Sequence, residues 1–284
     1  THIKVKSVLD ANGVESVLLK GMGLAYIYKN PDLRVCGDID LYIQPKDFHK
    51  SCQILREIPN CKINEYELDD DLHYKVNIDG CYIEIHSVTA SIQKALKPIY
   101  AKLEDDGLIK TKEYIEINKT KVKVPEIEYN IIFVLIHILG HFNHSGIGWR
   151  QLIDWTLLLH HRYSIYDDIV RIQKDAILRD TLIRLNIYEI WQTFGYVSVK
   201  YLGLPLKEMP LYTESVDKYG IRVCDRIMDD GNFSRENVKA WRAAPKNKII
   251  KAIHSFNNMI GNYVFTKQYF PQTAINNLKF LLYR

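Results

Sequence analysis

Hydrophobic and polar positions follow two different rhythms along the chain. Up to residue 125, short stretches of alternating character are interrupted by glycine, proline and asparagine. From residue 126 onward, apolar residues recur at the three- and four-residue spacing of amphipathic helices. The pattern predicts an α+β fold with two domains, a mixed β-sheet with flanking helices over 1–125 and an all-helical domain over 126–284.

The first half contains two turns that predict β-hairpins. Asp79-Gly80 tolerates the positive φ of a tight two-residue turn and joins 72–78 to 81–86, and Asn118-Lys119-Thr120 joins 113–117 to 121–124. The other predicted elements are a helix ending at Asn12-Gly13, a strand over 16–19, a glycine-led helix over 24–28, a strand over 37–43 and a helix over 46–57.

The second half is predicted to be helical from Pro125, whose fixed φ suits a first helical turn. Its amphipathic segments are 126–142, 149–161, 166–174, 179–196, 216–228 and 246–263. The pattern leaves open whether the last stretch, 269–284, packs on this domain or binds a partner.

Composition excludes several classes of protein. With 47% hydrophobic and 25% charged residues in 284, the chain is an ordinary globular protein, and no apolar run is long enough to span a membrane. The first residues lack the pattern of a signal peptide, so we expect a cytoplasmic protein without a membrane partner. Five cysteines without a C-x-x-C pair predict reduced thiols and argue against a cysteine zinc site.

The charge is distributed unevenly. The net charge is +4, and between 235 and 284 nine lysines and arginines face a single acid, Glu236. This excess favours an anionic partner such as phosphate, nucleic acid or an acidic protein, although a solvated basic helix face explains it equally well.

Two acids on the strand over 37–43 form the main candidate for chemistry. Asp38 and Asp40 lie at i and i+2 and therefore share a strand face, about 7 Å apart, opposite the apolar Ile39 and Leu41. Paired carboxylates suit Mg²⁺ or Mn²⁺, and Glu84 on the second hairpin strand is placed to be a third ligand. The alternative is a solvent-exposed strand face that simply carries acids.

The turn before the second helix is a candidate anion site. Lys20, Gly21 and Gly23 stand between a strand and a predicted helix N-terminus, where a cation and free N–H groups favour phosphate. Arg34, four residues before Asp38, is a further candidate to clamp phosphate oxygens, or it is a surface arginine near a turn.

A resemblance joins these motifs. The runs 17–28 and 37–43, with Leu33-Arg34 between them, are similar to the signature of the uncharacterised nucleotidyltransferase family in the polymerase-beta-like nucleotidyltransferase superfamily. The similarity continues through Ile83-Glu84-Ile85-His86 and into the helical half. There it includes His137, His141, Trp149-Arg150, Leu152 and Asp154.

The resemblance implies an N-terminal palm domain and an enzyme that moves a nucleoside monophosphate from a nucleoside triphosphate, such as ATP, to an acceptor hydroxyl and releases pyrophosphate. It implies Asp38, Asp40 and Glu84 as catalytic and metal-binding residues. It also implies nucleotide contacts from Lys20, Gly21, Arg34, His86, His141 and Arg150. The sequence departs from the wider superfamily at Lys20-Gly21, where a glycine followed by serine or glycine is usual.

Three functional interpretations remain open at this stage. The favoured one is the nucleotidyltransferase, with a small molecule or a protein as acceptor in preference to RNA, because the sequence has no recognisable RNA-binding motif. A second is a nucleotide-binding or regulatory protein that has lost turnover, in line with the altered Lys20-Gly21 turn. A third is a zinc hydrolase on His137 and His141, which share a helix face but lack the neighbouring glutamate of zinc proteases.

Overall fold

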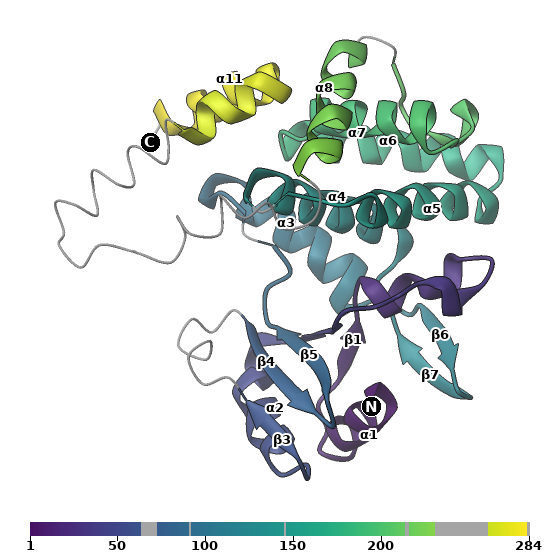
Figure 1. Cartoon of the computed structure of the whole chain (residues 1–284), viewed down its shortest axis with the longest axis vertical. Coiled ribbons are helices and arrows are strands. Elements are labelled where there is room, and N and C mark those ends of the chain that lie inside the picture. Colours follow the sequence, from purple (N-terminus) through teal and green to yellow (C-terminus); the bar gives the residue numbers. More distant parts are fainter. Residues whose placement is uncertain (64–72, 91, 145, 214–215, 231–260, 283–284) are drawn as a thin grey trace, which may run out of the picture. The chain divides into compact units, whose positions relative to one another are not determined.

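The computed structural model describes residues 1–63, 73–90, 92–144, 146–213, 216–230 and 261–282 (Figure 1). The chain forms two compact units, 1–93 with 100–133 and 94–99 with 134–284. The division of the chain into domains over 1–125 and 126–284 stays a prediction.

The first unit is built on a mixed five-stranded sheet. The strands lie in the order β1-β2-β5-β4-β3, and only β2 and β5 are parallel neighbours in it. This arrangement confirms the predicted mixed sheet. The strands are β1 (Ser16–Leu18), β2 (Ile39–Ile43), β3 (Cys61–Ile63), β4 (His73–Ile78) and β5 (Cys81–His86).

Helices α1 (His2–Ala11) and α2 (Phe48–Arg56) contribute to the apolar core of this sheet. The core combines Leu9 and Leu55 of the helices with alternate strand residues such as Leu41, Ile83 and Ile85. Because side chains alternate between the faces of a strand, the residues between these core positions point to the opposite face. That second face carries the polar side chains of β2, β5 and β4.

Both predicted hairpins are present. Asp79 and Gly80 have φ of 53° and 81°, and Asn118 and Lys119 have φ of 48° and 63°, as a tight turn between antiparallel strands requires. The second hairpin joins β6 (Tyr114–Ile117) to β7 (Thr120–Lys123) and forms a separate two-stranded sheet. Its turn is one residue shorter than predicted, since Thr120 already belongs to the strand.

Several short elements depart from the sequence prediction. The glycine-led helix is a 3₁₀ helix, η1 (Gly21–Ile27), and the helix over 46–57 consists of η3 (Pro45–Asp47) followed by α2. Another 3₁₀ turn, η2 (Pro31–Leu33), precedes β2. Helix α3 (Lys97–Glu104), extended by a π-helical turn over Asp105–Ile109, was not predicted from the sequence.

The described part of the second unit is helical, as predicted. Its core includes the edge-to-face pair Trp155 and Trp191, with ring centroids 5.1 Å apart, and Phe142 against Phe194. The long helices are α4 (Ile127–His144), which begins in the first unit, α5 (Trp149–Ile165), α6 (Asp168–Arg184), α7 (Tyr188–Tyr201), α8 (Asp217–Asp230) and α11 (Pro271–Leu282).

The helix boundary predicted between 174 and 179 is wrong. Helix α6 continues to Arg184, and the chain turns at Asn186, whose φ of 57° ends the helix in the left-handed conformation that asparagine tolerates. Its side-chain amide also donates to the Thr273 carbonyl at 3.2 Å. The predicted segment 246–263 lies outside the described residues up to 260.

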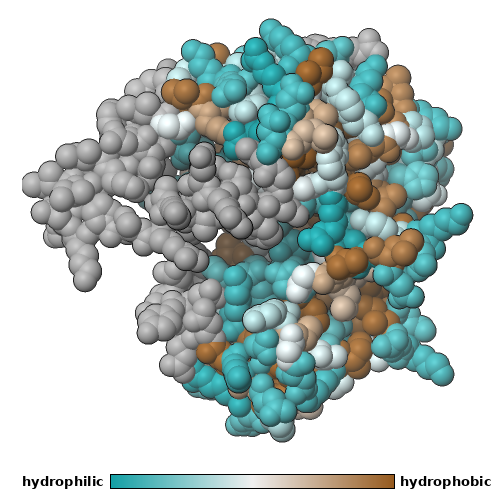
Figure 2. Space-filling model, in the orientation of Figure 1, coloured by the Kyte–Doolittle hydropathy of each residue, from teal (hydrophilic) through white to brown (hydrophobic). Residues whose placement is uncertain are grey.

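The surface shown in Figure 2 is mixed in character, with hydrophobic residues scattered among hydrophilic ones. None of the helices in the described ranges is long and apolar enough to cross a bilayer. All five cysteines are free thiols, as predicted.

Candidate active site

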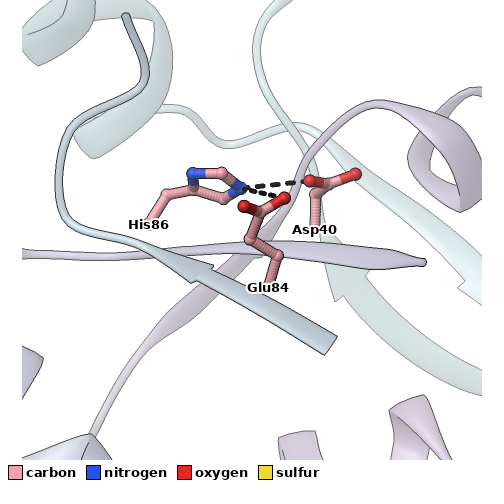
Figure 3. A group of neighbouring side chains, drawn as sticks. All are labelled: Asp40, Glu84 and His86. Atoms are coloured by element: carbon pink, nitrogen blue, oxygen red, sulfur yellow. Dashed lines mark hydrogen bonds and ion pairs between the residues drawn. The ribbon is translucent and has the colours of Figure 1, made fainter. Parts of the chain in front are cut away.

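The polar face of the sheet gathers charged side chains where β2 and β5 run parallel. The register pairs Asp40 with Glu84 and Tyr42 with His86, so these side chains share one face. One carboxylate oxygen each of Asp40 and Glu84 and a ring nitrogen of His86 lie within 4.8 Å of one another (Figure 3). The structure therefore brings together two of the three predicted carboxylates and a histidine predicted to contact nucleotide.

Asp40 is the buried member of this group, with 1% of its surface exposed. Its Oδ1 accepts hydrogen bonds from Lys20 Nζ at 2.5 Å and from His86 Nε2 at 3.0 Å. An ionised carboxylate can only accept, so the Nε2 nitrogen carries the proton in this arrangement. Burial by itself raises the pKa of Asp40, but the Lys20 charge and the His86 hydrogen bond outweigh it and hold the pKa well below its usual range.

Lys20 follows β1 and is fixed beside β2 by backbone pairing, because the N–H of Leu19 donates to the carbonyl of Asp40 at 2.9 Å. Burial lowers the pKa of the Lys20 ammonium, and the nearby charges of Asp40, Glu84 and Asp38 more than reverse this, so the pKa lies above its usual value. Lys20 is therefore a permanent cation within the acidic group.

Glu84 lies beside two basic residues of the neighbouring strand. Its Oε1 is 3.7 Å from Lys75 Nζ and 3.8 Å from His73 Nε2, and its Oε2 is 3.6 Å from His86 Nε2. His73 and Lys75 were not predicted as site residues from the sequence. The Asp79-Gly80 turn fixes the register of the hairpin, in which Lys75 pairs with Glu84 and His73 pairs with His86. Residue pairs counted outward from this turn would therefore have identified both.

Asp38 lies just before β2 and is exposed, and its carboxylate is not one of the three clustered ligands. Partial removal from water, then the charges of Asp40 and Glu84, raise its pKa, against an opposing effect of Lys20. Asp38 therefore stands within electrostatic range of the group. Its role as a metal ligand stays a prediction.

The glycine turn differs from the expected helix N-terminus. Gly21 adopts φ of +64°, which favours glycine, and it begins a 3₁₀ helix of seven residues. The N–H of Gly23 is already bonded to the Lys20 carbonyl at 3.2 Å, and a Cβ at Gly23 would lie 2.9 Å from the Leu18 carbonyl oxygen. Close packing thus explains Gly23, and any phosphate contact at this turn depends on Lys20 and Gly21.

The other predicted contacts have local partners. Arg34 Nη1 donates to the carbonyl of Val35 at 2.6 Å, next to the η2 turn. His141 packs edge-to-face on His137 in α4, with ring centroids 4.5 Å apart, and Arg150 is exposed at the start of α5. Their roles in binding nucleotide stay predictions.

The donor set fits a divalent cation. Two carboxylates are the ligands that Mg²⁺ prefers, and the imidazole extends the fit to Mn²⁺. Among the side chains that the structure describes, Asp40, Glu84 and His86 form the one cluster of three potential ligands, and it does not include His137 or His141.

A mixed sheet that brings Asp40 and Glu84 together agrees with the palm domain that the resemblance implied. The sequence profile of a family described as "Uncharacterised nucleotidyltransferase" matches residues 2–183, well over half of the chain. The chain therefore belongs to this nucleotidyltransferase family, as the resemblance implied.

Comparisons with curated proteins and with solved structures do not extend this family assignment. No curated protein matches the sequence. Among solved structures, the chain is similar to the crystal structure of an antigenic nucleotidyltransferase-like protein from Paracoccidioides brasiliensis, with 16% sequence identity and a TM-score of 0.37 over 55% of this chain and 72% of that one.

Proposed function

We propose that the protein transfers a nucleoside monophosphate from a nucleoside triphosphate to an acceptor hydroxyl, releases pyrophosphate and depends on Mg²⁺ or Mn²⁺. The supporting observation is the parallel register that pairs Asp40 with Glu84 beside Lys20, in a chain that belongs to a nucleotidyltransferase family. Lys20 offsets the repulsion between these carboxylates in the structure, and a bound divalent cation would take over that role.

Asp40 and Glu84 would hold the ion, with Asp38 as a further candidate ligand. His86 would bind the ion through Nε2 only after losing the proton that this nitrogen donates to Asp40. When bound, the ion would neutralise phosphate oxygens and lower the pKa of the acceptor hydroxyl. His86 orients the Asp40 carboxylate through its 3.0 Å hydrogen bond. Glu84 would assist in removing the proton of the acceptor hydroxyl.

Lys20 would bind the triphosphate. It replaces the residue that precedes the turn glycine in the wider superfamily, and its permanent charge offers an ammonium to phosphate oxygens next to Gly21. Arg34, His141 and Arg150 remain candidates for contacts with the rest of the nucleotide.

The acceptor is proposed to be a hydroxyl of a small molecule or a protein. The basic residues that would favour RNA lie mostly in 231–260, outside the described residues. If they bind RNA, the affinity will fall steeply with salt concentration, and a flat salt response would exclude RNA.

A nucleotide-binding protein without turnover is the second candidate. One observation favours it: Lys20 Nζ lies 2.5 Å from Asp40 Oδ1, where it competes with a metal ion for the same oxygen. A transferase needs this lysine to move toward phosphate when the ion binds, whereas a regulatory protein does not.

Calorimetry tests the proposal. Each of the four NTPs is titrated into the wild type and into Asp38→Ala/Asp40→Ala, with and without Mg²⁺ or Mn²⁺. We expect metal-dependent binding of at least one NTP that the double variant loses. Absence of binding by the folded wild type, or equal binding by the variant, would contradict the proposal.

A further inference from the structure

Helix α6 presents a row of isoleucines to solvent. Ile169 and Ile172 are each 71% exposed, Ile183 is 55% exposed, and Ile165, at the end of the preceding helix α5, is 47% exposed. Large apolar side chains occur singly on most protein surfaces, but a contiguous row of them marks an interaction site.

The row follows the geometry of the helix. At 3.6 residues per turn, the three isoleucines of α6 and the exposed Ala176 fall within about 60° of its circumference. The residues that α6 buries, Leu178 and Leu182, point about a third of a turn away. Within the described part of its own unit, the packing of α6 therefore leaves this stripe, Ile169/Ile172/Ala176/Ile183, exposed.

We propose that the stripe binds a second copy of the same chain, with the two α6 helices antiparallel about a twofold axis near residue 174. The spacing of the stripe is self-complementary about that point. Ile172 of one copy would face the small Ala176 of the other, so that a large side chain meets a small one at the centre. Such reciprocal pairing is the property of a twofold interface.

Charge at the border of the stripe supports a second copy as the occupant. Asp168, at the N-terminal end of α6, and Arg179, eleven residues later, lie on the same border and are both exposed. In the antiparallel arrangement, Asp168 of one copy faces Arg179 of the other, twice over. Asp168 also pairs with Arg171 of its own helix, which leaves its second carboxylate oxygen for the partner.

Light scattering over a concentration series tests the interface. We expect the wild type to change from the monomer to the dimer mass as concentration rises, and Ile172→Glu to remain a monomer. Ile177→Glu is the matched control, because Ile177 is 65% exposed on the same helix but lies outside the stripe. The proposal would be overturned if the wild type stays monomeric at every concentration, or if the Ile172→Glu variant dimerises as well as the wild type does.

Charge reversal tests the antiparallel geometry separately. Asp168→Arg and Arg179→Asp should each weaken the dimer, and the double variant should restore it, with far-UV circular dichroism confirming the fold of all three. Failure of the double variant to dimerise better than the single variants would contradict the twofold arrangement. None of these residues belongs to the candidate active site, so NTP binding serves as an independent check of folding.

Discussion

The ammonium of Lys20 lies 2.5 Å from the carboxylate of Asp40, inside the group of side chains proposed to hold a divalent cation. The ammonium of Lys20 thereby neutralises the buried charge of Asp40, as a bound metal ion would. In the proposed mechanism a metal ion and Lys20 need the same carboxylate, so binding of the ion would be coupled to release of the lysine. The released ammonium would then be available to a phosphate.

Replacing Lys20 with methionine tests this coupling. Loss of one partner of a buried ion pair should lower the free energy of unfolding by about 3 kcal/mol, because Asp40 then keeps only its His86 partner. Mn²⁺ should stabilise Lys20→Met more than the wild type, because its competitor is gone. Urea unfolding with and without Mn²⁺ measures both effects, and Lys20→Arg retains the charge as a control. A smaller Mn²⁺ effect in Lys20→Met than in the wild type would refute the competition.

A methyl group at Gly23 should disrupt the turn that positions Lys20. Its Cβ would lie 2.9 Å from the backbone oxygen of Leu18, so Gly23→Ala is expected to cost about 2 kcal/mol of stability. Gly37, between η2 and β2, has open space around the corresponding position, and Gly37→Ala should stay within about 0.5 kcal/mol of the wild type. Chemical denaturation of both variants provides the comparison, and equal effects would show that the turn tolerates a side chain.

Thr89, in the loop after β5, joins helices α3 and α4 through a partly buried network. Its hydroxyl donates to Glu104 at 2.6 Å and lies 2.9 Å and 2.8 Å from the hydroxyls of Tyr100 and Tyr129. Thr89→Val keeps the shape but leaves these partners without their common hydroxyl, so we expect a loss of about 2 kcal/mol in the free energy of unfolding. Thr89→Ser keeps the hydroxyl and should lose less than half as much. If both substitutions cost the same, packing and not hydrogen bonding is the cause.

His2 should make the protein less stable in acid. The ring is buried, neither nitrogen has a hydrogen-bond partner, and burial, followed by the charges of Lys6 and the N-terminus, lowers its pKa to about 4 from an ordinary 6.5. Below pH 6.5 the unfolded chain binds a proton that the folded chain does not, so stability falls as the pH falls toward 4. The contribution amounts to about 2 kcal/mol between pH 7 and pH 5.

His2→Leu removes this group and should flatten the pH dependence by that amount. Thermal or urea unfolding at pH 7 and pH 5 for both proteins measures the difference. The same pH dependence in the variant and the wild type would exclude His2 as its source.

The elements that the sequence predicted well are those with local causes. The Asp79-Gly80 and Asn118-Lys119 turns require positive φ, and this requirement identified both hairpins. Strand β3 and helix α3 escaped prediction because three residues and eight residues carry too little pattern. Asn186 takes the left-handed conformation just after the end of α6. The prediction put a helix boundary before this asparagine because it did not treat Asn186 as a residue that ends a helix.

Local sequence patterns likewise predicted only part of the candidate site. Alternation in the strand over 37–43 placed Asp38 and Asp40 on one face. That face was expected to be exposed to solvent, whereas Asp40 is buried. That burial arises from tertiary pairing of β2 with β1 and β5, which no local pattern contains. Alternation along the second hairpin strand was enough to suggest Glu84 as a third ligand, whereas the positions of Lys75 and His73 required the hairpin register.

Binding of Mn²⁺ tests the central claim most directly. Electron paramagnetic resonance of the free ion measures Mn²⁺ uptake by the wild type and by Asp40→Asn, which has nearly the same shape, in the presence of the NTP that calorimetry identifies or, failing that, each of the four in turn. The account predicts that the wild type takes up Mn²⁺ and that Asp40→Asn loses most of this uptake. Equal uptake by the two proteins, or none by the folded wild type with any NTP, would contradict it.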